Sequence, residues 1–194
     1  MDQFHCFWKQ HFPDCPPVSY LFKQRLADRW FRFHSLPESK RYPDNEIEVA
    51  QLLARQSTVL LDVIGIGECC LVSGHYSSSP PIEEQCSTLN EFKFQKFLRL
   101  PQQNFEPDEL ELDEELIYLE LFCGTHQLEY GSLDAVLLCV ANWQIINFFV
   151  VNCDRQRIFA PYDGGVDVIL KNSEERDEFK AKYQDWLSSH PQGL

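Results

Sequence analysis

Residues 145–170 read IINFFVVNCDRQRIFAPYDGGVDVIL, and this stretch decides the fold class. Residues 145–152 form an apolar, β-branched and aromatic run, and residues 157–162 follow it after a polar turn at Asp154 and Arg155. A third such run, 166–170, comes after two glycines. Short apolar runs separated by turn residues predict neighbouring antiparallel strands.

Gly164 and Gly165 predict a two-residue hairpin loop between the last two of these strands. With that loop, Tyr162 faces Asp167 across the hairpin. The alternation of side chains then places these two residues on one face of the sheet. The opposite face receives an apolar row, made of Phe159, Val166, Val168 and Leu170.

The rest of the chain adds both strands and helices around this hairpin. Further strands are predicted over residues 30–33, 68–76, 116–123 and 135–140. Helices are predicted over residues 4–12, directly after Pro16 and Pro17, over 45–64, and from Asn172 towards the end of the chain. Asn45 with Glu48, and Asn172 with Glu175, have the spacing of helix N-terminal caps. We therefore expect a single α+β domain over residues 1–194, with N-terminal and C-terminal helices packed against a mainly antiparallel sheet of about five or six strands.

The charge is strongly negative and unevenly distributed. The 194 residues carry 17 Lys and Arg against 30 Asp and Glu, a net charge of −13. Residues 1–60 hold 8 basic against 7 acidic side chains, whereas residues 61–194 hold 9 against 23. This charge argues against nucleic acid as a partner, because phosphate binding needs a positive surface, and it favours a basic protein. Seven acids within residues 106–115 predict a solvated, flexible segment over 101–115.

The sequence predicts a cytoplasmic protein with no membrane segment. No basic and apolar leader is apparent in residues 1–12. The most apolar window, 133–151, is interrupted by polar residues that are costly in hydrocarbon, namely Asp134, Asn142, Gln144 and Asn147. The eight cysteines are expected to be reduced, and several of them lie in apolar runs.

The first candidate site is the stretch RWFRFHSLPESKRY at residues 29–42. Cationic, imidazole and hydroxyl groups on a proline-stiffened turn can hold a phosphate, a carboxylate or an acidic partner. Alternatively, the cations neutralise acids of the chain itself. The candidate ligand- or partner-binding residues here are Arg29, Arg32, His34, Ser35, Ser39, Lys40 and Arg41.

The second candidate site is the stretch YDGGVD at residues 162–167, where Tyr162, Asp163 and Asp167 surround the two glycines. Its carboxylates could bind a cation or orient a base. The simpler alternative is a hairpin tip, because Asp-Gly is favoured there for conformational reasons. In a third reading, Asp163 or Asp167 pairs with Arg32 or Arg41, and the two stretches form one structural network.

Other motifs give no catalytic, metal or cofactor assignment. Cys123 and His126 make half of a zinc site with no second compact pair, and the early cluster His5, Cys6, His11 and Cys15 does not share one helix face. Cys69 and Cys70 are adjacent in a predicted strand, so at most one of them faces any pocket. Gly65-Ile66-Gly67 lacks the residues of a phosphate-binding loop. We therefore expect no metal and no cofactor, and the sequence assigns no catalytic residue and no oligomeric state.

The stretch at 29–42 resembles the signature R-W-x-R-F-H-S-L-P-x-S-K-R-Y of a bacterial family of unknown function. The Y-D-G-G-x-D hairpin at 162–167 and the ending YQDWLSSHP at 183–191 are also similar to that family. The resemblance implies a single domain and marks the same candidate residues. It implies no activity.

Two functions are specific enough to state at this level, beside a structural or assembly role for which the sequence has no discriminating feature. The first is a small acidic binding protein that recognises a protein partner, of the inhibitor or immunity-protein type, with charge that accelerates docking on a basic surface. The second is an enzyme or sensor that binds an anionic small molecule through Arg32, His34, Lys40 and Arg41.

Overall fold

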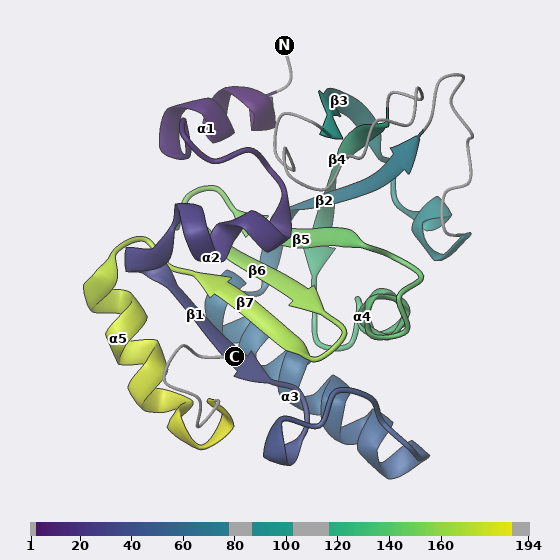
Figure 1. Cartoon of the computed structure of the whole chain (residues 1–194), viewed down its shortest axis with the longest axis vertical. Helices are drawn as coiled ribbons and strands as arrows, with labels where there is room; N and C mark the ends of the chain where they lie inside the picture. Colours follow the sequence, from purple (N-terminus) through teal and green to yellow (C-terminus); the bar gives the residue numbers. More distant parts are fainter. Residues whose placement is uncertain (1–2, 78–86, 103–116, 188–194) are drawn as a thin grey trace.

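The computed structural model describes residues 3–77, 87–102 and 117–187 of the chain. Its centre is a seven-stranded sheet in the order β1-β7-β6-β5-β2-β4-β3, in which all neighbours are antiparallel (Figure 1). The predicted α+β class is confirmed. The strands are β1 Trp30–His34, β2 Gly67–Ser77, β3 Gln95–Pro101, β4 Tyr118–Leu128, β5 Asn147–Asn152, β6 Arg157–Tyr162 and β7 Gly165–Ile169.

Strand β3 was not predicted, and a local irregularity explains why. Its register against β4 shifts between Lys96 and Leu98, so the alternation of apolar and polar residues is broken there. The acidic run at 106–115 and most of the predicted flexible segment 101–115 lie outside the described residues.

Helices cover both faces of the sheet. The α-helices are α1 Gln3–His11, α2 Phe22–Arg25, α3 Glu46–Ile64, α4 Asp134–Ala141 and α5 Ser173–Lys182. Short 3-10 helices lie at η1 Ser19–Leu21, η2 Ala27–Arg29, η3 Pro37–Ser39, η4 Ser87–Glu91 and η6 Gln184–Trp186. Side chains of α3 and α4, and of the segment from α5 to η6, share one core with the predicted apolar row Phe159, Val166, Val168 and Leu170. Side chains of α1 and α2 share a second core with the other face of the sheet.

Helix α3 begins as its sequence predicts. The Asn45 side chain accepts a hydrogen bond from the Glu48 backbone N–H at 3.1 Å, which caps the first turn. The Glu48 carboxylate reaches back to the Asp44 backbone N–H at 2.7 Å, one residue before the usual capping-box partner. Gly65, with φ of 87°, ends the helix.

The strand predicted over residues 135–140 is wrong, because this segment is helix α4. Its buried residues are Val136, Leu137, Val140 and Ala141, a helical spacing that a short, uniformly apolar run does not reveal in sequence. Asp134 accepts a hydrogen bond from the Ser57 hydroxyl at 2.9 Å and so ties the start of α4 to α3. No helix in the described ranges combines the length and the apolar character needed to cross a bilayer.

The hairpin between β6 and β7 forms, but with a different loop. Tyr162 pairs with Gly165, so the two loop residues are Asp163 and Gly164. Asp167 therefore faces Ala160 instead of Tyr162. The register differs from the prediction by two residues, and an even shift keeps each side chain on its predicted face.

The φ angle of Gly165 does not lie in the left-handed region that favours glycine. The reason for a glycine at this position is the lack of space for a side chain. A Cβ atom at this position would lie 2.2 Å from the carbonyl oxygen of Phe33 in β1. Strand β1 can therefore approach the hairpin only because residue 165 has no side chain. This contact joins the two candidate stretches, which lie more than 120 residues apart in the chain.

Candidate functional site

Arg32 and Asp167 face each other across strands β1 and β7. The guanidinium donates from Nε to Oδ1 at 2.6 Å and from Nη2 to Oδ2 at 2.9 Å, a two-pronged pairing. The guanidinium carbon also lies 4.4 Å from the centre of the Tyr162 ring. Asp167 is only 4% exposed, so this pair neutralises a carboxylate inside the protein.

The pKa shifts of Arg32 and Tyr162 keep each side chain in one charge state. Burial lowers the pKa of Arg32, but the hydrogen bond and charge of Asp167 outweigh it, and the pKa is raised overall. Burial raises the pKa of Tyr162 to about 12. Arg32 is therefore cationic and Tyr162 neutral near neutral pH, and neither is suited to exchange a proton there.

Asp163, at the hairpin tip, is 6% exposed and binds three side chains. Its Oδ2 accepts from the Tyr42 hydroxyl at 2.9 Å and from Trp143 Nε1 at 3.0 Å. The same carboxylate forms an ion pair with Arg41. The Arg41 guanidinium carbon lies 5.6 Å from the ring centres of both Tyr42 and Trp143. We call Arg41, Tyr42, Trp143 and Asp163 the tip cluster.

The tip cluster has a buried anchor and an exposed rim. The side chain of Arg41 is 56% exposed, and Tyr42 and Trp143 are 46% and 58% exposed. Trp143 has a φ of 60°, a left-handed conformation that bulky residues rarely adopt. Because the Trp143 indole is hydrogen-bonded to both Asp163 and Tyr42, the surrounding groups hold it in this conformation.

Three further predicted residues are His34 in β1, Ser35 directly after it, and Ser39 in η3. His34 is 8% exposed. The Ser35 hydroxyl accepts from Gln56 Nε2 at 2.8 Å, and its backbone N–H donates to the Gly164 carbonyl at 3.2 Å. Ser39 is exposed, with a φ of 57°.

Lys40 and Arg29 bind other partners than the hairpin. The Lys40 ammonium donates to Asp44 at 2.7 Å and to Glu48 at 2.6 Å, and the Asp44 contact is the largest cause of its raised pKa. Arg29 donates weakly to the Lys171 carbonyl at 3.5 Å. Burial lowers the Arg29 pKa. The structure thus joins Arg32 to Tyr162 and Asp167, and Arg41 to Asp163, as the network reading expected.

Sequence reasoning missed Trp143. It lies between the segments 135–140 and 145–152, both predicted to be strands, so its indole had no assigned surroundings. The available signal was an isolated tryptophan between Asn142 and Gln144, outside every apolar repeat.

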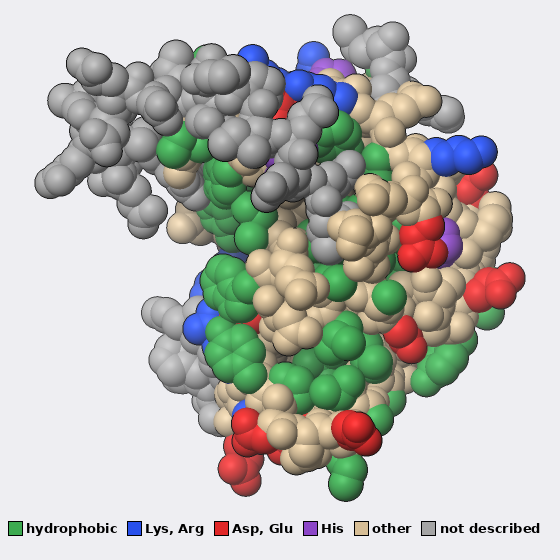
Figure 2. Space-filling model, turned by 90° about the vertical axis from the view of Figure 1, so that its right-hand side faces the viewer, with side chains coloured by type: hydrophobic (Ala, Val, Ile, Leu, Met, Phe, Trp, Pro, Cys, Tyr) green, Lys and Arg blue, Asp and Glu red, His purple; other side chains and the backbone are tan. Residues whose placement is uncertain are grey.

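Figure 2 shows one face of the molecule, with hydrophobic side chains gathered on its lower half and acidic side chains below and to the right of them.

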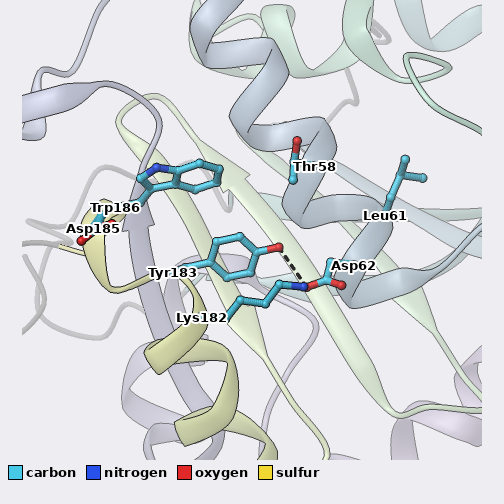
Figure 3. A pocket seen from close by; sticks show the side chains of 7 residues that line it. All are labelled: Thr58, Leu61, Asp62, Lys182, Tyr183, Asp185 and Trp186. Atoms are coloured by element: carbon cyan, nitrogen blue, oxygen red, sulfur yellow. Dashed lines mark hydrogen bonds and ion pairs between the residues drawn. The ribbon is translucent and has the colours of Figure 1, made fainter.

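One cavity, of about 500 Å³, lies between α3 and the segment from α5 to η6 (Figure 3). The Asp62 carboxylate at its wall accepts from Tyr183 at 2.9 Å and from Lys182 at 2.6 Å. Its remaining lining side chains are Thr58, Leu61, Asp185 and Trp186. None of the predicted site residues lines it.

Within residues 3–77, 87–102 and 117–187, no group of three or more His, Cys, Asp or Glu side chains is arranged to bind a metal ion. His126, which the sequence placed in half of a zinc site, instead has Nε2 at 3.1 Å from the Ser132 hydroxyl.

A family model described as a domain of unknown function (DUF3885) matches residues 18–191. The chain belongs to the DUF3885 family. The DUF3885 match includes both candidate stretches and Trp143, whereas α1 precedes it. No curated protein and no solved structure matches the chain.

Proposed function

We propose that this DUF3885 member is a small, acidic, cytoplasmic protein that binds a basic protein partner, in the manner of an inhibitor or immunity protein. The observation that carries the proposal is the tip cluster. Its exposed members are an arginine, a tyrosine and a tryptophan. These three residue types dominate the binding energy of protein interfaces.

The tip cluster is already ordered without a partner. Asp163 fixes all three exposed side chains, and the hairpin backbone in turn fixes Asp163. Ordering a flexible side chain on binding costs roughly 0.5–1.5 kcal/mol, and a preformed cluster avoids much of this. The arrangement is therefore suited to docking.

The charge around the tip cluster favours a basic partner. Residues 38–48 contain four acids and two bases, which gives this segment a net charge of −2. Lys40 is paired with acids of that same segment. A negative margin around an aromatic centre complements a cationic surface and speeds association at low salt.

The alternative, binding of an anionic small molecule through Arg32, His34, Lys40 and Arg41, has weaker support. Arg32, Lys40 and Arg41 are each paired with a carboxylate of the same chain. An anion would have to displace these partners.

The cytoplasmic assignment is supported by the described cysteines, which are free thiols.

The test is affinity purification with the full-length chain in an extract of its native host, with Trp143→Ala and Tyr130→Ala as matched variants. Tyr130 is 67% exposed and lies outside the tip cluster, so it controls for general loss of an exposed aromatic ring. We expect one stoichiometric, basic protein partner. The purified partner should bind the Trp143→Ala variant at least about tenfold more weakly than the unchanged chain. It should bind the Tyr130→Ala variant as tightly as the unchanged chain.

Two further results would count against the proposal. One is the absence of any stoichiometric protein partner, and the other is a partner that both variants bind equally well. Titration of the full-length chain with inorganic phosphate, followed by calorimetry, addresses the alternative. Saturable binding that Arg41→Gln abolishes would replace the protein-binding proposal with the anion-binding one.

A further inference from the structure

A second cavity, of about 710 Å³, lies between α1 and the sheet. Its wall includes Phe4 and Phe7 from α1, Lys93 before β3, and four cysteines. Besides Cys69, these are Cys70, Cys123 and Cys153, which come from neighbouring parts of the sheet. Cys123 belongs to β4, Cys70 to β2, and Cys153 follows the last residue of β5. Because β4, β2 and β5 are adjacent, their order places Cys70 between the other two thiols.

The Sγ atoms of Cys70 and Cys153 lie 3.7 Å apart. Both residues are partly exposed and line the cavity. A disulfide requires about 2.05 Å between the sulfurs, so a small side-chain adjustment separates the pair from a bond. Cys153 lies in a turn beyond β5, where no strand pairing fixes its backbone.

The hydrogen bonds around Cys70 favour its ionised form. Contacts from the Cys123 and Cys153 thiols lower the pKa of Cys70, with Cys123 the larger cause. The same contact with Cys70 raises the pKa of Cys153, which therefore retains its proton. A thiolate is the nucleophile in thiol oxidation, so Cys70 has the character of the attacking sulfur and Cys153 that of the resolving one.

We propose that Cys70 and Cys153 form an oxidisable dithiol that hydrogen peroxide converts into an intramolecular disulfide. In the first step the Cys70 thiolate attacks peroxide. An S–O bond forms, the O–O bond breaks, the sulfur is oxidised by two electrons, and hydroxide leaves. In the second step the Cys153 sulfur attacks the sulfenic sulfur of Cys70. The S–S bond forms, the S–O bond breaks, and the thiol proton leaves with the departing oxygen as water.

This dithiol is separate from the tip cluster, and the proposal does not depend on partner binding. Cys15 and Cys69 differ from this dithiol. Burial raises the pKa values of Cys15 and Cys69 to about 12, which makes both unreactive near neutral pH. Cys6 is exposed and does not line this cavity, so it provides an internal reference.

In the test, the full-length chain is treated with hydrogen peroxide, and the remaining thiols are blocked with N-ethylmaleimide. Peptide mass spectrometry then identifies the blocked, oxidised and cross-linked cysteines. We expect a Cys70–Cys153 cross-linked peptide, a loss of two hydrogens from the intact mass, and an unoxidised Cys6. With brief iodoacetamide treatment at pH 6, Cys70 should be alkylated at least about tenfold faster than Cys6, because its lowered pKa makes Cys70 a thiolate there.

Two variants separate the roles of the sulfurs. In Cys153→Ser, dimedone should trap a sulfenic acid on Cys70, whereas in Cys70→Ser, Cys153 should stay unmodified at the same peroxide dose. Thermal melting checks that each variant is folded. The peptide map of the unchanged chain tests the proposal even if a variant does not fold. Oxidation of Cys6 before Cys70, or no cross-linked peptide at a dose that oxidises Cys6, would overturn the proposal.

Discussion

At the scale of single residues, the two candidate stretches are held together by contacts that sequence spacing cannot reveal. The Arg32–Asp167 pair joins residues 135 positions apart, and the Arg41–Asp163 pair joins residues 122 apart. The residue types were identifiable in advance, because charged side chains beside glycines and aromatic rings are rare in plain connectors. Which cation meets which carboxylate depends on the pairing of β1 with β7, and one sequence does not determine that pairing.

Gly165 gives a residue-scale prediction. Gly165→Ala places a Cβ atom 2.2 Å from the Phe33 carbonyl oxygen, a backbone atom that cannot rotate away. We expect a loss of about 3 kcal/mol in the free energy of unfolding, measured by urea denaturation.

Gly164→Ala is the matched control for this prediction. Its Cβ atom would lie 3.0 Å from an atom of the Tyr162 ring, and a side chain can shift more easily than backbone. We expect a clearly smaller loss. Equal losses for the two variants would show that strand approach is not the reason for the glycine at position 165.

At the scale of secondary structure, capped and periodic elements were predictable, and short apolar ones were not. Helix α3 has both a polar cap and a long amphipathic repeat, and it was predicted over residues 45–64. Helix α4 has 8 residues, too few to distinguish helical from strand periodicity when nearly all of them are apolar. The faces of β6 and β7 were predicted correctly, but their register differs by two residues because the loop consists of Asp163 and Gly164. The need for a glycine at position 165 appears only when β1 is present.

Helix α3 gives a prediction about capping. Asn45→Ala removes the side-chain oxygen that accepts the Glu48 backbone N–H, and we expect a loss of about 1 kcal/mol in the free energy of unfolding. Asn45→Asp keeps an acceptor at the same position and should retain most of the stability. Urea denaturation of both variants checks this. A loss of equal size in Asn45→Asp would show that the amide, rather than the cap, is what matters.

At the scale of the whole molecule, buried neutral groups predict instability at alkaline pH. Burial raises the pKa values of Cys15 and Cys69 from 9.0, and that of Tyr162 from 10.0, to about 12 in each case. Between the ordinary and the raised value, the unfolded chain has lost these protons while the folded chain keeps them. Stability from these groups is therefore complete below pH 9 and falls as the pH rises through 9 to 12.

Denaturation midpoints measured from pH 8 to 11.5 test this expectation, with Tyr162→Phe as the diagnostic variant. Phenylalanine has no ionisable hydroxyl, so the variant should lose stability less steeply above the ordinary tyrosine value of 10.0 than the wild type does. Identical slopes would mean that Tyr162 is accessible to ionisation in the folded protein.

The pairing of β1 with β7 also bears on how the chain is made. Residues 30–34 leave the ribosome long before residues 165–169, so the nascent chain carries an aromatic segment whose hydrogen-bonding neighbour does not yet exist. Such distant pairings are late events, and exposed segments of this kind attract chaperones and neighbouring chains while they wait. Completion of the sheet must therefore follow synthesis of the chain as far as residue 169, and a translation product that stops before residue 163 lacks the tip cluster.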